Sequence, residues 1–186
     1  LIRLGIELCR IMNYLHSFKP NPILYLDLHP GNLLICREQL KLIDFDQAAL
    51  ASLSQERSVC YGTKGFAAPE QYEGGTLDER TDIYAIGALL YYMGTGHAPE
   101  GEIKAGQGSC RGDLYILMGR CLRTEKKERC QSVREVLEAL EKLEARIFAE
   151  RHIPLLRIAA AGSRSGIGVT HTALGAVRYL RQKGVS

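Results

Sequence analysis

The sequence lacks the features that would point to a membrane or an extracellular setting. It has no apolar run of about 18 residues or more, which is the length that a membrane-spanning helix needs. It shows no signal peptide, and its six cysteines form no CxxC pair and have no histidine at metal-ligand spacing. We therefore expect reduced thiols in a cytoplasmic protein with no membrane segment in this stretch.

The sequence also lacks a charge imbalance. Its 186 residues carry a net charge of only +3, without a long block of lysine and arginine. We therefore expect no nucleic acid and no membrane surface as a partner. With 46% hydrophobic and 24% charged residues, the composition is that of a globular protein able to bury a core. The oligomeric state is left open.

The hydrophobic pattern predicts a mainly α-helical chain of the α+β class. Helices are expected at residues 1–17, 81–93, about 113–123 and from 132 onward. The last of them opens with a capping box, in which Ser132 precedes Glu135 by three positions. A strand is expected at residues 23–26, followed by a hairpin of 33–36 with 40–43. Residues 47–72 show no sustained period, which predicts a long functional or mobile loop.

A polar loop interrupts the apolar residues of "LYLDLHPGNLLI". It places Asp27, His29 and Asn32 around a Pro-Gly turn, where polar groups are displayed rather than hidden. A second carboxylate, Asp44, follows the next apolar segment. Two carboxylates and an amide oxygen can hold Mg²⁺, because this ion takes hard oxygen ligands and leaves room for phosphates. One acid could then bind the metal while the other accepts a proton, although each aspartate alone is typical of an ordinary turn.

Several motifs, in family order, resemble the eukaryotic-type protein kinases found in bacteria. "YLDLHPGNLLI" is similar to the catalytic loop HRDLxxxN, "LIDF" to the DFG motif, and "GTKGFAAPEQY" to the end of the activation segment. "DIYAIGALLYYMGTGHAP" resembles the central helix, and "CLRTEKKERC" the stretch with a structural arginine. The resemblance covers residues 1–145 and implies the C-terminal lobe of a kinase. The N-terminal lobe is missing, so we expect a fragment of a longer protein that is inactive by itself.

The resemblance implies a Ser/Thr protein kinase that uses ATP and Mg²⁺ and acts on a protein substrate. Asp27 would accept the proton of the substrate hydroxyl, and Asn32 and Asp44 would hold Mg²⁺ against the nucleotide phosphates. Thr63 would help to align the substrate and the base. His29 stands where the family has a lysine, so its help with the transferred phosphoryl group would be weaker or dependent on pH.

The resemblance also implies structural contacts and shows two departures. Glu70 would pair with Arg129, and Asp82 would brace the catalytic-loop backbone. Leu26 stands where the family has an arginine that docks an activation-loop phosphate, so activity should depend little on such docking. Asp46 replaces the glycine of DFG, which removes a flexible position and adds negative charge near the metal.

Two other interpretations stay open. In the first, the protein is a pseudokinase, a binding module that keeps the fold but has lost catalytic activity. Leu26, His29 and Asp46 would then be substitutions that accompany this loss. In the second, it is a small-molecule phosphotransferase, because "DLHPGN" also resembles the loop of the aminoglycoside kinases. The stretch "GTKGFAAPEQY" favours the protein kinases over this second interpretation.

The sequence changes character near Pro154, which predicts a helical linker at 146–154 and the start of an α/β domain at 155–186. There an apolar run, a glycine-bearing turn and a helical pattern predict a strand, a phosphate-type loop and a helix. The turn "RSGIGVT" resembles the deviant Walker A loop of the partitioning-type P-loop ATPases.

This second resemblance implies nucleotide-binding roles for Gly166, Gly168 and Thr170, while Arg164 could stand for the first lysine. Val169 occupies the position of the principal phosphate lysine, which makes ATP hydrolysis doubtful. A structural or docking role, nucleotide binding, and an unrelated strand-turn-helix therefore all stay open.

Overall fold

The computed structural model describes residues 1–37, 39–54, 62–100, 103 and 112–152. The chain divides into two units, Leu1–Glu144 and Ala145–Ser186. In the second unit, the described residues 145–152 continue a helix that begins in the first. The predicted P-loop-like residues Gly166, Gly168 and Thr170 lie outside the described residues.

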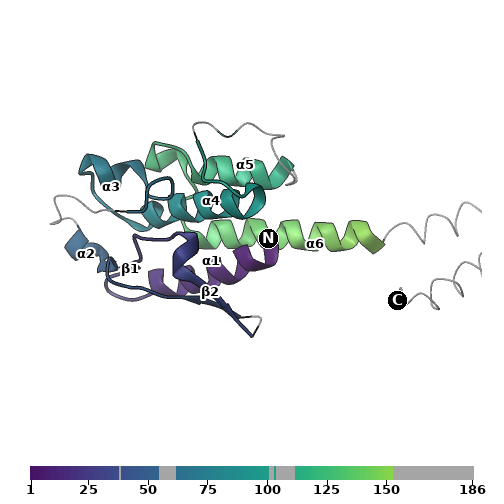
Figure 1. Ribbon diagram of the computed structural model, residues 1–186, viewed down its shortest axis with the longest axis horizontal. Helices are drawn as coiled ribbons and strands as arrows, with labels where there is room; N and C mark the ends of the chain where they lie inside the picture. Colours follow the sequence, from purple (N-terminus) through teal and green to yellow (C-terminus); the bar gives the residue numbers. More distant parts are fainter. Residues whose placement is uncertain (38, 55–61, 101–102, 104–111, 153–186) are drawn as a thin grey trace, which may run out of the picture. The chain divides into compact units, whose positions relative to one another are not determined.

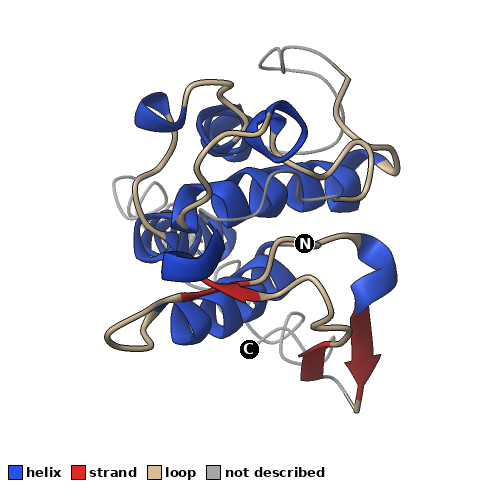
Figure 2. Ribbon diagram, turned by 90° about the vertical axis from the view of Figure 1, so that its left-hand side faces the viewer, coloured by secondary structure: helices blue, strands red, loops and turns tan. Residues whose placement is uncertain are grey.

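The first unit is mainly helical and contains two small antiparallel sheets (Figure 2). One sheet pairs β1 (Ile23–Leu24) with β4 (Ala49–Leu50), and the other pairs β2 (Leu33–Cys36) with β3 (Gln39–Leu42). The longer helices are α1 (Ile2–His16), α4 (Glu79–Thr95), α5 (Gly112–Cys121) and α6 (Val133–His152). The short ones are α2 (Ala51–Ser54), α3 (Pro69–Glu73), and the 3₁₀ turns η1 (Pro30–Asn32) and η2 (Lys126–Glu128). This content agrees with the predicted α+β class.

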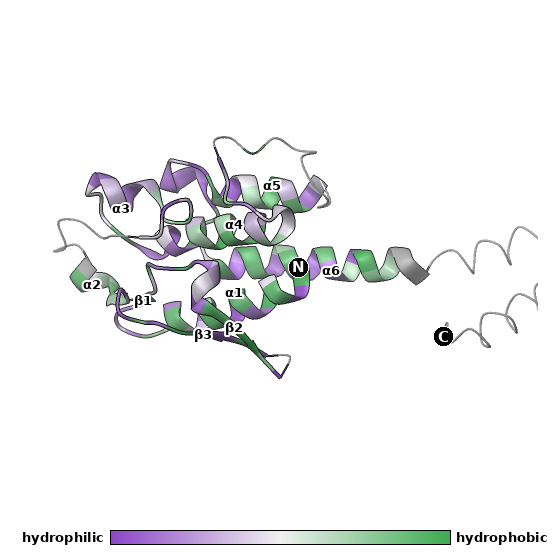
Figure 3. Cartoon of the chain, in the orientation of Figure 1, coloured by the Kyte–Doolittle hydropathy of each residue, from purple (hydrophilic) through white to green (hydrophobic). Residues whose placement is uncertain are grey.

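Helix α4 forms the centre of the core and packs against α1 and α5 (Figures 1 and 3). Asp78 caps its start by accepting a hydrogen bond from the backbone of Arg80, and Gly96 ends it in the left-handed conformation. The helix is therefore longer at both ends than the predicted residues 81–93. At Gly87 an added Cβ would lie 2.5 Å from the Cβ of Cys121, so glycine lets α5 approach closely.

The predicted hairpin is confirmed, and it places the candidate residues. Leu33 of β2 pairs with Leu42 of β3, so the residues just before β2 and just after β3 lie at the same end. There the backbone N–H of Ile43 donates to the carbonyl of Asn32 over 3.0 Å. This pairing brings the Asp44 turn beside the loop that carries Asn32.

The predicted strand at 23–26 is shorter in the structure, because β1 ends at Leu24. The backbone N–H groups of Tyr25 and Leu26 donate to the carboxylate of Asp82 instead of to a neighbouring strand. A side chain distant in the sequence therefore ends this strand.

The described part of residues 47–72 contains β4, α2 and α3, where the sequence predicted a long loop. Helix α3 begins at Pro69, which suits the first helical position, and the side chain of Gln71 accepts a hydrogen bond from Ala68 N–H. It ends at Gly74 in the left-handed conformation. These elements are too short to give a hydrophobic period, so the pattern missed them.

Helix α6 confirms the predicted helix after Ser132, with one change at its start. Ser132 Oγ accepts from the backbone N–H of Glu135 over 3.2 Å, as a capping box requires. The Glu135 carboxylate reaches back to the N–H of Gln131 over 2.8 Å, one residue earlier than in the usual box. In the part of the chain that the structure describes, no helix is long and apolar enough to cross a membrane.

Candidate active site

Asp27 lies in the loop between β1 and η1, and the turn that follows it is stabilised by residues of the same loop. His29 caps η1, and its Nδ1 accepts a hydrogen bond from the N–H of Gly31 over 3.2 Å. Pro30 occupies the first position of the turn, where its fixed φ is favourable. Because Nδ1 acts as an acceptor, the neutral His29 ring carries its hydrogen on Nε2, which faces Asp27.

Three of the predicted site residues meet at Asp27. Thr63 Oγ1 donates to Asp27 Oδ1 over 2.8 Å, although the two residues are far apart in the sequence. The amide nitrogen of Asn32 donates to the Asp27 carbonyl over 3.0 Å and lies 3.4 Å from its Oδ2. His29 Nε2 lies 3.7 Å from the same Oδ2. The side chain of Asp27 keeps 22% of its surface exposed, so it can meet an incoming group.

Asp44 is held differently, in an exposed turn after β3. Its backbone has a φ of 59°, and its Oδ1 accepts from the N–H of Asp46 over 3.3 Å. Aspartate tolerates this left-handed conformation better than most residues, partly because its side chain bonds locally. Within the described residues, no group of three or more His, Cys, Asp or Glu side chains is placed to hold a metal ion. The predicted metal pair, Asn32 and Asp44, is a different set, because it combines one amide with one carboxylate.

Tyr25 joins the Asp44 turn to the Asp27 loop. Its hydroxyl donates to the carbonyl of Ile43, and its ring meets Phe45 edge-on at 5.2 Å between centroids. Burial raises the pKa of the Tyr25 phenol well above its ordinary value, and the charge of Asp27 adds to this effect. Tyr25 therefore stays a neutral hydrogen-bond donor at physiological pH.

The backbone just before Asp27 is strained and firmly held. Leu26 has a φ of 67°, which is unusual for a residue with a bulky side chain. Buried Asp82 accepts from the N–H groups of Tyr25 and Leu26 over 2.9 and 2.8 Å. Gln71 Nε2 donates to the Leu26 carbonyl over 2.8 Å. The predicted bracing by Asp82 is confirmed, and it explains how this conformation persists.

His16 is a supporting residue that the sequence interpretation missed. Its Nε2 lies 2.8 Å from Asp82 Oδ2, and its side chain is only 8% exposed. The helical pattern gave no sign of this contact, because a single histidine at a helix end is unremarkable. His16 thus extends the hydrogen-bonded network behind Asp27 to helix α1.

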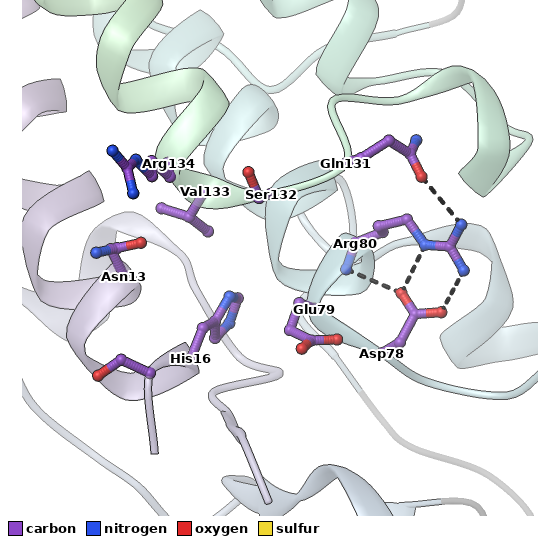
Figure 4. Close-up of a pocket in the computed structure, with 10 residues that line it drawn as sticks. Asn13, His16, Asp78, Glu79, Arg80, Gln131, Ser132, Val133 and Arg134 are labelled. Atoms are coloured by element: carbon purple, nitrogen blue, oxygen red, sulfur yellow. Dashed lines mark hydrogen bonds and ion pairs between the residues drawn. The ribbon is translucent and has the colours of Figure 1, made fainter. Parts of the chain in front are cut away.

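His16 also lines a pocket of about 490 Å³ between the end of α1 and the starts of α4 and α6 (Figure 4). Among the residues drawn there, Arg80 binds Asp78 through Nε and Nη2 and also donates a hydrogen bond to Gln131. Burial raises the pKa of Asp78, but hydrogen bonds from Arg80 and Lys126 outweigh it and lower the pKa to about 2. Asp78 is therefore negatively charged at neutral pH, and it binds both Arg80 and Lys126 at this side of the pocket.

The predicted pair of Glu70 and Arg129 is confirmed as a buried, two-pronged ion pair. The two nitrogens of the guanidinium lie 2.7 and 2.8 Å from the two carboxylate oxygens. Arg129 also donates to the carbonyls of Arg123, Thr124 and Arg80. The pair ties α3 to the segment before α6, and α3 follows the stretch that carries Thr63.

Leu26, the departure from the family pattern, lies in a small apolar cluster. It is 2% exposed and packs with Leu24 and Leu77, with Ala49 and Ala51 at the edge. The position where the family has a basic residue is therefore filled by apolar packing against β4 and α2.

Known proteins share sequence with this chain. The protein kinase domain model matches residues 3–151. The chain is 30% identical to Integrin-linked protein kinase 1 of Arabidopsis thaliana, over 89% of this chain and 36% of that protein. It is 30% identical to Serine/threonine-protein kinase A of Synechocystis sp., over 76% of this chain and 32% of that protein.

A third relative is the DNA damage-responsive serine/threonine-protein kinase RqkA of Deinococcus radiodurans, which is 37% identical over 48% of this chain and 14% of that protein. The chain thus spans between 14% and 36% of the length of these three relatives. Since the family model matches most of its residues, the chain belongs to the protein kinase domain family.

Proposed function

We propose that this chain is the C-terminal lobe of a Ser/Thr protein kinase, which transfers the γ-phosphoryl group of ATP to a protein hydroxyl. The observation that carries the proposal is the hydrogen bond from Thr63 Oγ1 to Asp27 Oδ1 at 2.8 Å. It joins the loop with the candidate base to the stretch that resembles the end of an activation segment. The bacterial Ser/Thr kinases among the relatives support the choice of acceptor.

Asp27 is the proposed general base. One of its oxygens is bound by Thr63, and the other faces His29 and Asn32. This arrangement fixes the carboxylate while leaving part of it exposed, which is what a base needs in order to accept a hydroxyl proton. His29, with its Nε2 hydrogen directed at Asp27, is a proposed positioning residue and a source of positive charge when protonated.

Asn32 and Asp44 are the proposed Mg²⁺ ligands, and their chemistry fits that ion. Both offer hard oxygen atoms, and Asn32 uses its amide nitrogen for the contacts with Asp27, so its amide oxygen is the atom for the cation. Bound Mg²⁺ would neutralise negative charge on the phosphates. Asp46, exposed beside Asp44, adds a further negative charge to this turn.

We further propose that activity does not require a phosphate on the activation segment. Leu26 offers no positive charge to such a phosphate, and its packing with Leu77 and Ala51 holds the start of that segment by apolar contact. The free thiols of Cys9, Cys36, Cys121 and Cys130 support a reducing, cytoplasmic location for the kinase.

Residues 146–154 are the proposed linker and 155–186 the proposed start of a P-loop-like domain. The sequence pattern around Gly166, Gly168 and Thr170 supports this part of the proposal. Their proposed role is to present backbone N–H groups to an anion.

The decisive experiment is a phosphoryl-transfer assay on the full-length protein, with labelled ATP and Mg²⁺, beside its Asp27→Asn variant. We expect autophosphorylation or transfer to a general protein acceptor to fall by about 10²–10⁴-fold in the variant, the usual contribution of a general base. ATP binding, measured separately, should stay within about twofold, because Asp27 is not a proposed metal ligand.

A matched control is Glu73→Gln, which removes one exposed carboxylate from α3 and should leave transfer unchanged. Equal transfer by the wild type and the Asp27 variant would refute the assignment of the base. Absence of transfer by the wild type, with ATP bound, would favour a pseudokinase. Transfer to an aminoglycoside or sugar, and not to protein, would favour a small-molecule phosphotransferase.

A further inference from the structure

Three fully buried cysteines come from three different parts of the first unit. Cys9 belongs to α1, Cys121 is the last residue of α5, and Cys130 lies shortly before α6. The sulfur atoms of Cys121 and Cys130 are 4.0 Å apart. This separation is about 2 Å more than a disulfide bond, a gap that small side-chain and backbone adjustments can close.

The three thiols differ in how readily they ionise. The hydrogen bond donated by Cys121 lowers the pKa of Cys130, and the guanidinium of Arg120 adds to this effect against the cost of burial. The same bond raises the pKa of Cys121, because ionisation would break it. Burial raises the pKa of Cys9 to about 12. Cys130 is therefore the nucleophile of the group, and Cys121 is the neighbour that can attack it.

The segment between Cys121 and Cys130 holds the arginine clamp described above. The carbonyls of Arg123 and Thr124 accept from Arg129 Nε and Nη2 over 2.7 and 2.8 Å. Arg129, which directly precedes Cys130 in the sequence, also binds the carboxylate of Glu70. A bond between the two cysteines would close this segment into a loop and would hold Arg129 in place.

We propose that Cys121 and Cys130 form a redox-sensitive pair, which hydrogen peroxide converts into a disulfide that fixes the Arg129 clamp. The Cys130 thiolate attacks a peroxide oxygen, the O–O bond breaks, and the departing hydroxide takes a proton to become water. The sulfur of Cys121 then attacks the resulting Cys130 sulfenic acid, loses its proton, and releases the oxygen as a second water. Two thiols are oxidised and one hydrogen peroxide is reduced.

Burial sets the expected rate of this reaction. Both sulfur atoms are shielded, while Gln131, which follows Cys130, and Glu128, two positions before it, are exposed. Access to Cys130 therefore needs a local opening of the segment before α6. We expect oxidation of the pair to be slower than oxidation of Cys36, the exposed thiol on β2.

The test uses the full chain treated with hydrogen peroxide, then alkylated under denaturing conditions and mapped by mass spectrometry. We expect a cross-linked peptide joining Cys121 and Cys130, and a rise in melting temperature of about 5 °C. Dithiothreitol should reverse both effects. The Cys36→Ser variant should behave as the wild type, while Cys130→Ser should give neither effect.

Oxidation of Cys36 in the wild type shows that the peroxide is active, so complete alkylation of Cys121 and Cys130 in that sample would overturn the proposal. A link from either residue to Cys9 would also overturn it. Cys121→Ser serves as a second variant if Cys130→Ser does not fold. The readouts are a cross-linked peptide and a melting temperature, so they do not depend on phosphoryl transfer.

Discussion

The Asp27 loop and the Asp44 turn carry the two candidate carboxylates, and they differ in how firmly the rest of the protein holds them. Asp27 sits on a backbone that buried Asp82 holds through Tyr25 and Leu26, and Thr63 fixes its side chain. Asp44 is exposed, and its carboxylate accepts a hydrogen bond from Asp46 in the same turn. A base must be held in position before the substrate arrives, whereas a metal ligand can be ordered by the ion that it binds.

Removal of the Asp82 carboxylate should have the largest effect on stability, because Asp82 holds the backbone of the Asp27 loop. Asp82→Asn replaces one of the acceptors of the two backbone N–H groups by a donor, inside a buried network that includes His16. We expect the free energy of unfolding to fall by about 3 kcal/mol, because buried hydrogen bonds to a charged group are lost. Urea denaturation of the full chain measures it.

Asp46→Asn is the matched control, since it removes an exposed aspartate, and it should change stability by less than about 0.5 kcal/mol. Equal stability of the Asp82 variant and the wild type would mean that the hydrogen bonds of Asp82 do not stabilise the Asp27 loop.

A smaller effect is expected from Thr63, whose hydroxyl donates a hydrogen bond to the side chain of Asp27. Thr63→Val keeps the shape but loses the hydroxyl hydrogen bond of 2.8 Å. We expect kcat/KM for transfer by the full-length kinase to fall by about 10–100-fold, which is about 1–3 kcal/mol. Steady-state kinetics with a protein acceptor measure the change.

Thr63→Ser retains the hydroxyl and should restore most of that activity. If the serine variant is as slow as the valine variant, the methyl group of Thr63 matters, and the hydrogen bond to Asp27 does not.

The smallest effect on the fold is expected at Asp44. Asp44→Asn changes an exposed side chain, so the free energy of unfolding should move by less than about 0.5 kcal/mol. The same variant should weaken binding of Mg²⁺-ATP to the full-length kinase by at least about tenfold, because one charged ligand is lost. Calorimetric titration gives the affinity.

If Asp44→Asn lowers the free energy of unfolding by more than about 1 kcal/mol, Asp44 also supports the fold, and the contrast with the firmly held Asp27 loop is lost. Unchanged Mg²⁺-ATP affinity would remove Asp44 from the metal site. In the second case, the site would need another metal ligand in place of Asp44.

The sequence predicted much of this site because its signals are local. A Pro-Gly turn between apolar runs placed Asp27, His29 and Asn32 in one loop, and two apolar runs predicted the hairpin that precedes Asp44. The register of that hairpin, which brings Asp44 beside the loop, is known only from the structure. Resemblance to the kinases added the long-range pair of Glu70 with Arg129, which the structure confirms. The predicted roles of these residues in transfer stay predictions.

Other features left no local signal. His16 ends an ordinary amphipathic helix, and only the packing of α1 against α4 brings it to Asp82. The early end of β1 has the same origin, because Asp82 takes the backbone donors that would continue the strand. The short helix α3 was missed because five residues cannot show a helical period.

By itself, the sequence determined the longer helices, the hairpin and the polar loop, because hydrophobic spacing and turn residues act over a few neighbouring positions. The tertiary structure alone decided which distant groups meet: Thr63 with Asp27, His16 with Asp82, and Cys121 with Cys130. These contacts depend on how whole helices pack. Burial then gives them their strength, since water no longer competes for the same hydrogen bonds.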